Sequence, residues 1–402
     1  MQKIKEVVER VSMSRVKGRL PLLYLIGFTA NSSIHVVAPV VPIFTIQSLN
    51  GSVADAGYVV SAFYIASMAV KTLLAISGRE QRATATLLLS CVLILAAPLA
   101  YRYSSSLGVF FLSRFVHGTG FALLAASALS LATLMSGQGS RGKAINNYTG
   151  FLALGLMIGP AISSLFLVFV GIREIFILSA AVASPSVLCS LLLFKSFKIR
   201  LPKESGSLIE PLRSRIASLF AHRDFMFASL SYFSYAFAYG AFLSYAPVYL
   251  KQVYGFPASL VTALFSGYFT LTAISRFFVY KVQKVVGAFN FLVATLLGAS
   301  LLGLVIFSVR ALPVFVGAFL MMGFVHGIIF PLTAIIVMRT VEATSLILAN
   351  SVYLLAFDLG TTAGPILTSG LARYQIPAAL MASVMPCFLA GVSILFTRSR
   401  RG

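Results

Sequence analysis

The residues of this sequence that could do chemistry are a few charged side chains inside long apolar stretches. Asp358 lies near the middle of one stretch, with Thr361 and Thr362 on its own helical face. A charge at bilayer depth costs at least about 2.5 kcal/mol on insertion scales, so it needs a compensating role. A carboxylate that is dry in one conformation and hydrated in another changes its affinity for protons. Asp358 is therefore predicted to couple protons to movement, the alternative being a hydrogen-bonded clasp between helices.

Arg114 and two histidines are further candidates for proton coupling. Arg114 lies about 10 Å inside its stretch, by the helical rise per residue, and His117 at i+3 shares its face. The two are expected to line a cavity, unless helix-end carbonyls satisfy Arg114. His35 follows Asn31 by one helical turn. Histidine changes charge near neutral pH, although a lone histidine in a membrane also serves as hydrogen-bonded glue.

A stripe of tyrosines suggests where a solute would bind. Tyr232, Tyr235 and Tyr239 are spaced i, i+3 and i+7, which puts three phenols on one helical face. Such a wall accepts apolar or cationic solutes through ring faces and hydroxyls. Asn31 and His326 complete the predicted substrate cavity. Ordinary helix packing produces the same spacing, so both interpretations stay open.

The elements that must position these residues are membrane-spanning helices. The chain is 59% hydrophobic and 10% charged, whereas a soluble domain is roughly one-quarter charged. Apolar runs long enough to cross about 30 Å of hydrocarbon recur along the chain. Twelve helices are predicted, at residues 21–46, 55–77, 84–101, 107–134, 145–170, 174–195, 225–250, 258–281, 287–308, 312–338, 343–371 and 376–397. We expect an all-α integral membrane fold.

The Lys and Arg residues indicate the orientation of these helices. One side of the predicted membrane carries 23 of them and the other side five. Because cytoplasmic loops carry the basic excess, both termini are expected in the cytoplasm and the chain in the cell membrane. Basic charge placed between apolar segments does not indicate nucleic-acid binding. Residues 196–223 are a basic cytoplasmic linker, and residues 1–20 and 398–402 are cytoplasmic ends.

Two basic residues inside helices are candidates for a cytoplasmic gate. Lys71 and Arg276 lie about 8 to 9 Å from the cytoplasmic ends of their helices, within reach of the membrane surface. Contacts to helix C-termini of the opposite half would close that side.

The second half of the chain repeats features of the first at an offset of 205 to 209 residues. The matches are Ala38-Pro39-Val40 with Ala246-Pro247-Val248, Phe115-Val116-His117-Gly118 with Phe324-Val325-His326-Gly327, Lys71 with Arg276, and Gly155, Gly159, Pro160 and Ser164 with Gly360, Gly364, Pro365 and Ser369. Parallel halves at residues 21–195 and 224–397 predict two pseudo-symmetric six-helix bundles with a solute site between them. The glycine and proline pairs are predicted to let interface helices pack closely and bend.

Two stretches resemble motifs of the major facilitator superfamily, in its proton-coupled drug-efflux branch. They are Arg114-Phe-Val-His-Gly-Thr-Gly120 and Gly155-Leu-Met-Ile-Gly159-Pro160. The resemblance covers essentially the whole chain and implies an antiporter in which Arg114 takes part in proton coupling. The antiporter motif's usual trailing glycines are Ser163-Ser164 here. The loop Ala75–Arg82 keeps the glycine and basic residues of the general family motif without its aspartate.

These features predict a secondary transporter, a monomer whose partners are a small solute, protons and lipid. Two alternatives stay open, uptake or facilitated passage of a metabolite or organic anion, and a receptor or scaffold on the same fold. We expect no enzyme, because no nucleophile, base and metal ligands cluster. We expect no cofactor or metal either, because Cys91, Cys189 and Cys387 stand singly. The phosphate-loop-like Gly137–Lys143 is followed by Ala144, where Ser or Thr would hold magnesium.

Overall fold

The computed structural model is almost entirely helical, as the sequence predicts. It describes residues 18–77, 81–136, 140–196, 200–201, 212–309, 311–340 and 346–399. The helices are α2 (Leu20–Val37), α3 (Val40–Gln47), α4 (Val53–Ser77), α5 (Ala83–Tyr103), α6 (Leu107–Met135), α7 (Arg141–Phe166), α8 (Ile172–Ser196), α9 (Leu212–Ala221), α10 (Arg223–Tyr254), α11 (Ala258–Val286), α12 (Ala288–Ser308), α13 (Leu312–Thr340), α14 (Leu346–Tyr374) and α15 (Ile376–Ser399). Most of the predicted N-terminal segment, residues 197–199 and 202–211 of the linker, residues 78–80 of the loop motif, residues 137–139 of the phosphate-loop-like stretch and residues 400–402 lie outside the described residues.

Twelve membrane-length helices are present in the described ranges. Ten spans are long and apolar enough to cross a membrane, and α2 and α3 together form the first of them, Leu20–Gln47. The other two helices, α10 and α14, are 32 and 29 residues long, and they carry the three predicted tyrosines and Asp358 respectively. The expected all-α membrane fold is confirmed.

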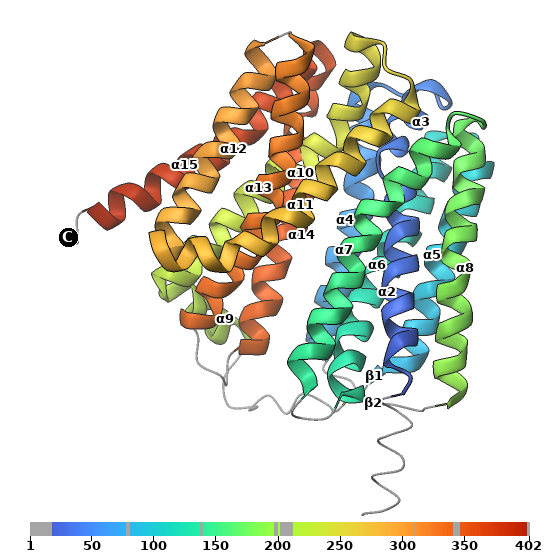
Figure 1. Cartoon of the computed structure of the whole chain (residues 1–402), viewed down its shortest axis with the longest axis horizontal. Coiled ribbons are helices and arrows are strands. Elements are labelled where there is room, and N and C mark those ends of the chain that lie inside the picture. Colours follow the sequence, from blue (N-terminus) through green and yellow to red (C-terminus); the bar gives the residue numbers. More distant parts are fainter. Residues whose placement is uncertain are drawn as a thin grey trace, which may run out of the picture.

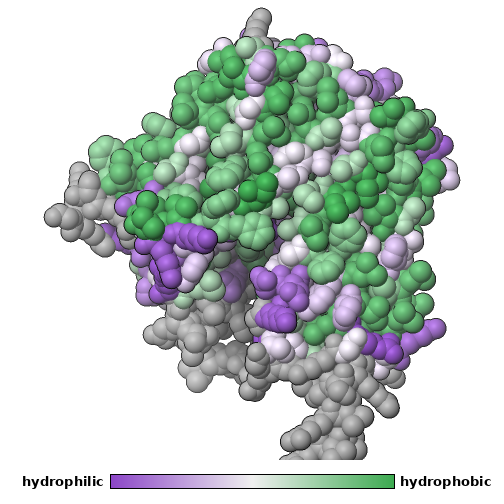
Figure 2. All heavy atoms as spheres, in the orientation of Figure 1, coloured by the Kyte–Doolittle hydropathy of each residue, from purple (hydrophilic) through white to green (hydrophobic). Residues whose placement is uncertain are grey.

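The helices form two bundles that lie side by side (Figure 1). Helices α2 to α8 pack on one another as the N-terminal bundle, and α10 to α15 as the C-terminal bundle. The bundles meet where α4 packs on α14 and α7 on α11, and α10 also touches α3 and α4. In Figure 1 they come together toward the end where α3 lies, here called the α3 end, and diverge toward the end of α9, here called the linker end. Figure 2 shows the surface hollowed between the bundles at the linker end.

A short strand pair at the linker end was not predicted. Strand β1 (Gln81–Arg82) pairs antiparallel with β2 (Arg200–Leu201). The pairing ties the turn after α4 to the start of the linker after α8. Both strands belong to the side of the chain that carries most of the basic residues.

Matching hydrogen bonds join the two bundles at a constant spacing of 205 residues. Ser61 Oγ of α4 donates to the Thr362 carbonyl of α14 at 3.0 Å. Ser266 Oγ of α11 donates to the Met157 carbonyl of α7 at 3.1 Å. Both the donors and the acceptors are 205 residues apart in sequence. The two α4–α14 and α7–α11 interfaces are therefore copies of each other.

Close helix contacts at glycine follow the same spacing. A Cβ added at Gly118 of α6 would overlap the Phe63 carbonyl of α4, and a Cβ at Gly323 of α13 would overlap the Tyr268 carbonyl of α11. Gly118 thus corresponds to Gly323, not to Gly327 as the repeated Phe-Val-His-Gly string suggests. The string is displaced by four residues, about one helical turn. It keeps its helix face but shifts its depth in the membrane.

The predicted glycine-proline sites lie where helices approach most closely. Gly155 and Gly159 of α7 pack against the backbone of α2, and Gly360 and Gly364 of α14 pack against the backbone of α10. Helices α7 and α14 run through Pro160 and Pro365 without ending, and the Tyr245 hydroxyl of α10 donates to the Pro365 carbonyl at 2.6 Å. Small residues let backbones approach in a membrane, where close packing replaces the hydrophobic effect.

Candidate functional site

The strongest polar contact between the bundles is an ion pair in the membrane-spanning region. Lys71 Nζ of α4 lies 2.7 Å from Asp358 Oδ2 of α14. The Asp358 side chain is 2% exposed and the Lys71 side chain 23%. Ser67 Oγ, one turn before Lys71, donates to the same carboxylate oxygen at 3.2 Å. Two side chains of the N-terminal bundle therefore converge on one carboxylate of the C-terminal bundle.

This pair changes the predicted roles of its two members. Lys71 was expected to contact helix C-termini of the opposite half, but its ammonium group pairs with the Asp358 side chain of that half. Lys71 Nζ also lies 5.3 Å from the centre of the Phe121 ring of α6. The attraction within a buried pair offsets part of the cost of burying the two charges, whereas removing one partner leaves the other unpaired, at a cost of about 3–5 kcal/mol. The contact thus depends strongly on whether Asp358 carries its charge.

Arg114 lies inside the N-terminal bundle and does not reach Asp358. Its guanidinium donates to the Val59 carbonyl at 3.3 Å and to the Tyr101 hydroxyl at 3.2 Å. The Phe63 ring centre lies 4.7 Å from it. The Tyr101 hydroxyl in turn contacts His117 Nδ1 at 2.8 Å, and Arg114 and His117 are both buried. The expected cavity-facing pair is a packed network between α4, α5 and α6.

Replacing Arg114 by Met should lower the free energy of unfolding by about 1.5–3 kcal/mol, because hydrogen bonds from a charged donor are lost. Thermal unfolding of the purified chain in detergent measures this. Arg141→Met is the matched control, because Arg141 is exposed at the start of α7 and should change stability by less than about 0.5 kcal/mol. Unchanged stability in Arg114→Met together with a lost proton response would instead make Arg114 a coupling residue.

The three predicted tyrosines form a continuous aromatic cluster in the C-terminal bundle. Tyr232 stacks on Tyr353 of α14, with ring centres 4.6 Å apart, and on Phe357 at 4.9 Å. Tyr239 also contacts Phe357, at 5.9 Å. Phe357 directly precedes Asp358, so the aromatic cluster ends beside the ion pair.

His326 of α13 joins this cluster. Tyr239 stacks on its ring with centres 4.4 Å apart. The Tyr235 hydroxyl lies 3.1 Å from His326 Nδ1 and 3.2 Å from the Tyr268 hydroxyl of α11. The tyrosines are buried and His326 is half-buried. Four of the five predicted cavity residues therefore lie together, and the sequence did not single out their partner Tyr268.

Asn31 and His35 of α2 point to different neighbours. Asn31 Nδ2 donates to the Leu152 carbonyl of α7 at 2.6 Å, within the N-terminal bundle. His35 Nδ1 donates to the Asn31 carbonyl at 2.8 Å, which fixes the proton on that nitrogen. The His35 ring meets Phe269 of α11 edge to face, with centres 5.3 Å apart. Of the two, it is His35 that contacts the opposite bundle.

Tyr64 of α4 links these groups and was not predicted. It is half-buried and interacts electrostatically with both Asp358 and Tyr239. His35 and His326 are also close enough to interact electrostatically with each other. We call the set of six residues that come from both bundles the central cluster. Its members are His35, Tyr64, Lys71, Tyr239, His326 and Asp358.

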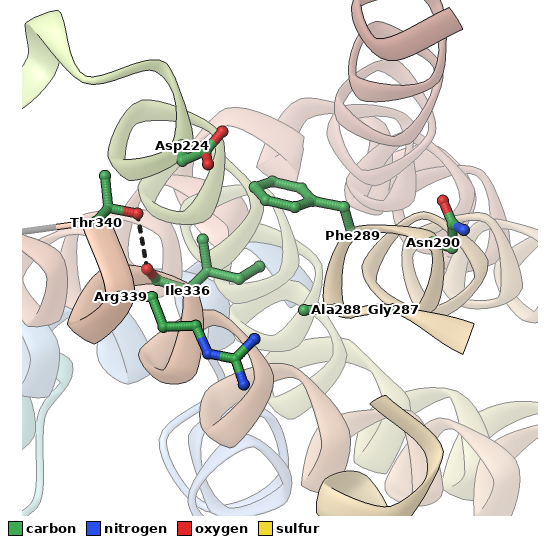
Figure 3. Close-up of a pocket in the computed structure, with 8 residues that line it drawn as sticks. All are labelled: Asp224, Gly287, Ala288, Phe289, Asn290, Ile336, Arg339 and Thr340. Carbon is green, nitrogen blue, oxygen red and sulfur yellow. Dashed lines mark hydrogen bonds between the residues drawn. The ribbon is translucent and has the colours of Figure 1, made fainter. Parts of the chain in front are cut away.

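A separate pocket of about 370 Å³ lies at the linker end of the C-terminal bundle. Figure 3 shows it between the starts of α10 and α12 and the end of α13. Its lining residues are Asp224, Gly287, Ala288, Phe289, Asn290, Ile336, Arg339 and Thr340. None of them belongs to the central cluster or to the predicted site. Within the described residues, no three His, Cys, Asp or Glu side chains gather as a metal site would require.

The architecture and the motifs can be compared with known proteins. The sequence model of the Major Facilitator Superfamily matches residues 23–345. The chain belongs to the Major Facilitator Superfamily. No curated protein matches it at the level required for significance. It is a multi-pass membrane protein with the fold of this superfamily's transporters.

Solved structures of superfamily transporters share the fold over almost the whole chain. A bacterial homologue of the human lysosomal transporter Spinster, inward-facing and unoccupied, is 17% identical with a TM-score of 0.70, over 96% of this chain and 95% of that one. The nucleoside transporter NupG is 12% identical with a TM-score of 0.76, over 94% and 99%. The peptide transporter POT in complex with sulfate is 12% identical with a TM-score of 0.78, over 95% and 94%. At these identities the likeness concerns the fold alone.

Proposed function

We propose that this chain is a secondary transporter that exports a small amphipathic solute in exchange for protons. The two bundles, residues 21–195 and 224–397, rock about a central site and are joined by the linker at residues 196–223. The Lys71–Asp358 ion pair carries the proposal, because it joins the bundles and contains the one carboxylate of the central cluster. Protonation of Asp358 would remove one charge of that pair and weaken the contact.

The basic residues support an orientation with the linker end in the cytoplasm. Of the Lys and Arg residues outside helix interiors, 23 belong to that side and five to the other. Hydrogen bonds between the bundles, such as Tyr58 to Ser369 and Ser164 to Ser259, lie toward the α3 end. With the surface hollowed at the linker end (Figure 2), the conformation is then one that opens to the cytoplasm.

The position of the Lys71–Asp358 pair favours exchange of solute for protons over proton-coupled uptake of solute. In the deprotonated, empty carrier the pair holds the bundles in the present conformation and opposes the return to the other one. A solute whose binding between the bundles weakens this contact removes the obstacle, so outward movement requires solute. An uptake carrier, by contrast, must return empty and deprotonated, and the same pair would slow its cycle. Differential stabilisation of two conformations is what couples a ligand to movement.

Inverted membrane vesicles that contain the chain, carry an imposed proton gradient and report internal pH by a dye test this function. Adding a transported solute should dissipate the gradient at a rate that rises with solute concentration, and vesicles without the chain should not respond. A panel of amphipathic anions, cations and neutral compounds serves as the probe. Solute moving in the same direction as protons would support the uptake alternative. The absence of solute movement under every gradient, together with stable binding of a partner protein, would support a receptor or scaffold.

A further inference from the structure

Arg276 of α11 is the counterpart of Lys71 in the repeat, but its acidic partner is missing. Lys71 and Arg276 are 205 residues apart, the spacing that also relates the hydrogen bonds of the two interfaces. The position 205 residues before Asp358 is Ala153 of α7. Helix α7 packs on α11 as α14 packs on α4. One interface therefore has a lysine and an aspartate at the two related positions, and its copy has an arginine and an alanine.

Among the residues that the structure describes, none supplies another counter-ion to Arg276. Its Nε is buried and has no hydrogen-bond partner among the described residues. Arg276 belongs to neither of the ion pairs found among the described residues, which are Lys71–Asp358 and Arg102–Glu174. Tyr232 of the aromatic cluster and His326 are close enough to interact electrostatically with Arg276. An uncompensated guanidinium inside a membrane protein is costly and points to a function.

The chemistry of this position suits an anion attached to an apolar body. A guanidinium presents several N–H groups in a planar fork that matches the two oxygens of a carboxylate, phosphate or sulfonate. The buried ring of Tyr232 and the half-buried ring of Phe357, which stacks on it, offer a surface for an aromatic or aliphatic group. Ala153 supplies no carboxylate at the position that corresponds to Asp358.

We propose that Arg276 binds the anionic group of the transported solute, which takes the place that an acidic side chain at position 153 would occupy. This inference rests on the proposed transport function and narrows its substrate class to amphipathic organic anions. Solute binding would then complete in the α7–α11 interface the ion pair that Asp358 completes in the α4–α14 interface. The two interfaces become equivalent only when solute is bound.

The test places an acid at that position in the full chain. Purified wild type and variants are heated in detergent with benzoate, phenyl phosphate or naphthalene-2-sulfonate, each compared with its neutral amide, alcohol or sulfonamide analogue. At least one anion should raise the unfolding midpoint of the wild type when its neutral analogue does not. Ala153→Asp should weaken binding of that anion at least tenfold, because its own carboxylate pairs with Arg276. Ala153→Asn, which has the same size without the charge, should bind it as the wild type does.

A second variant keeps the test decisive if Ala153→Asp does not fold. Arg276→Gln should also weaken anion binding at least tenfold, and Arg276→Lys should have an intermediate effect because it keeps the charge without the fork. The inference is overturned if no anion stabilises the wild type more than its neutral analogue, or if Arg276→Gln binds anions like the wild type. Anion binding without any proton exchange in vesicles would contradict the proposed function alone. Proton exchange only for neutral or cationic solutes would contradict this inference alone.

Discussion

Asp358→Asn is expected to reduce proton-driven solute movement at least tenfold in vesicles. The amide has nearly the same size as the carboxylate and cannot bind or release a proton at physiological pH. It also leaves Lys71 without a counter-charge in a site where Asp358 is almost fully buried. We expect the dye signal that follows solute addition to disappear, while the chain still inserts into the membrane.

Loss of stability must be separated from loss of coupling in that experiment. Breaking a buried pair by removing one partner costs about 3–5 kcal/mol, so Asp358→Asn alone will also unfold at a lower temperature. The double variant Asp358→Asn with Lys71→Gln removes both charges and should recover much of that stability without recovering proton coupling. Glu174→Gln breaks the more exposed pair with Arg102 and should change either property little. A proton response in Asp358→Asn equal to that of the wild type would eliminate Asp358 as the coupling residue.

The helices could be predicted from the sequence because hydropathy is a local property. The prediction for residues 287–308 corresponds to α12 at Ala288–Ser308, and the prediction for residues 107–134 corresponds to α6 at Leu107–Met135. The length of an apolar run fixes a span without any knowledge of its neighbours. For the same reason the two-residue strands β1 and β2 were missed, since their pairing joins segments about 120 residues apart.

The partners of the charged residues could not be predicted in the same way. Helical periodicity shows that His117 shares a face with Arg114, but it does not show which helix that face meets. The structure supplies Tyr101 of α5 as the residue between them. Lys71 and Asp358 are 287 residues apart, and only the packing of α4 on α14 brings them together. The position of a residue along its helix could be predicted from the sequence, and the helix that its side chain contacts could not.

The register of the repeat shows how short apolar strings can mislead. The string Phe-Val-His-Gly aligns the halves at 209 residues, whereas glycine contacts and interface hydrogen bonds align them at 205. His326 then corresponds to Phe121, not to His117. The structure supports this assignment, because Phe121 lies beside Lys71 as His326 lies within range of Arg276. The basic pair Lys71 and Arg276 gave the correct spacing, since charged residues inside helices rarely coincide by chance.

Gly364→Ala is expected to destabilise the chain by about 1–3 kcal/mol or more, the range observed when a methyl group is forced into a packed core. A Cβ at this position would overlap the Phe237 carbonyl of α10, which belongs to the helix backbone and cannot rotate away. The α10–α14 contact would have to separate, and α14 carries Asp358. Thermal unfolding in detergent should show a lower midpoint, and Gly364→Leu should leave little folded protein after extraction.

The same substitution at Gly370, another position of α14, should not lower the stability of the chain. A Cβ added at Gly370 meets no atom within 4 Å, so Gly370→Ala encounters no steric conflict. Alanine in a helix interior is favoured over glycine by about 0.5–1 kcal/mol, because glycine loses more backbone entropy on folding. Gly370→Ala should therefore unfold at the same temperature as the wild type or at a higher one. Equal effects of the two substitutions would mean that α14 does not approach α10 as closely as the glycine contacts require.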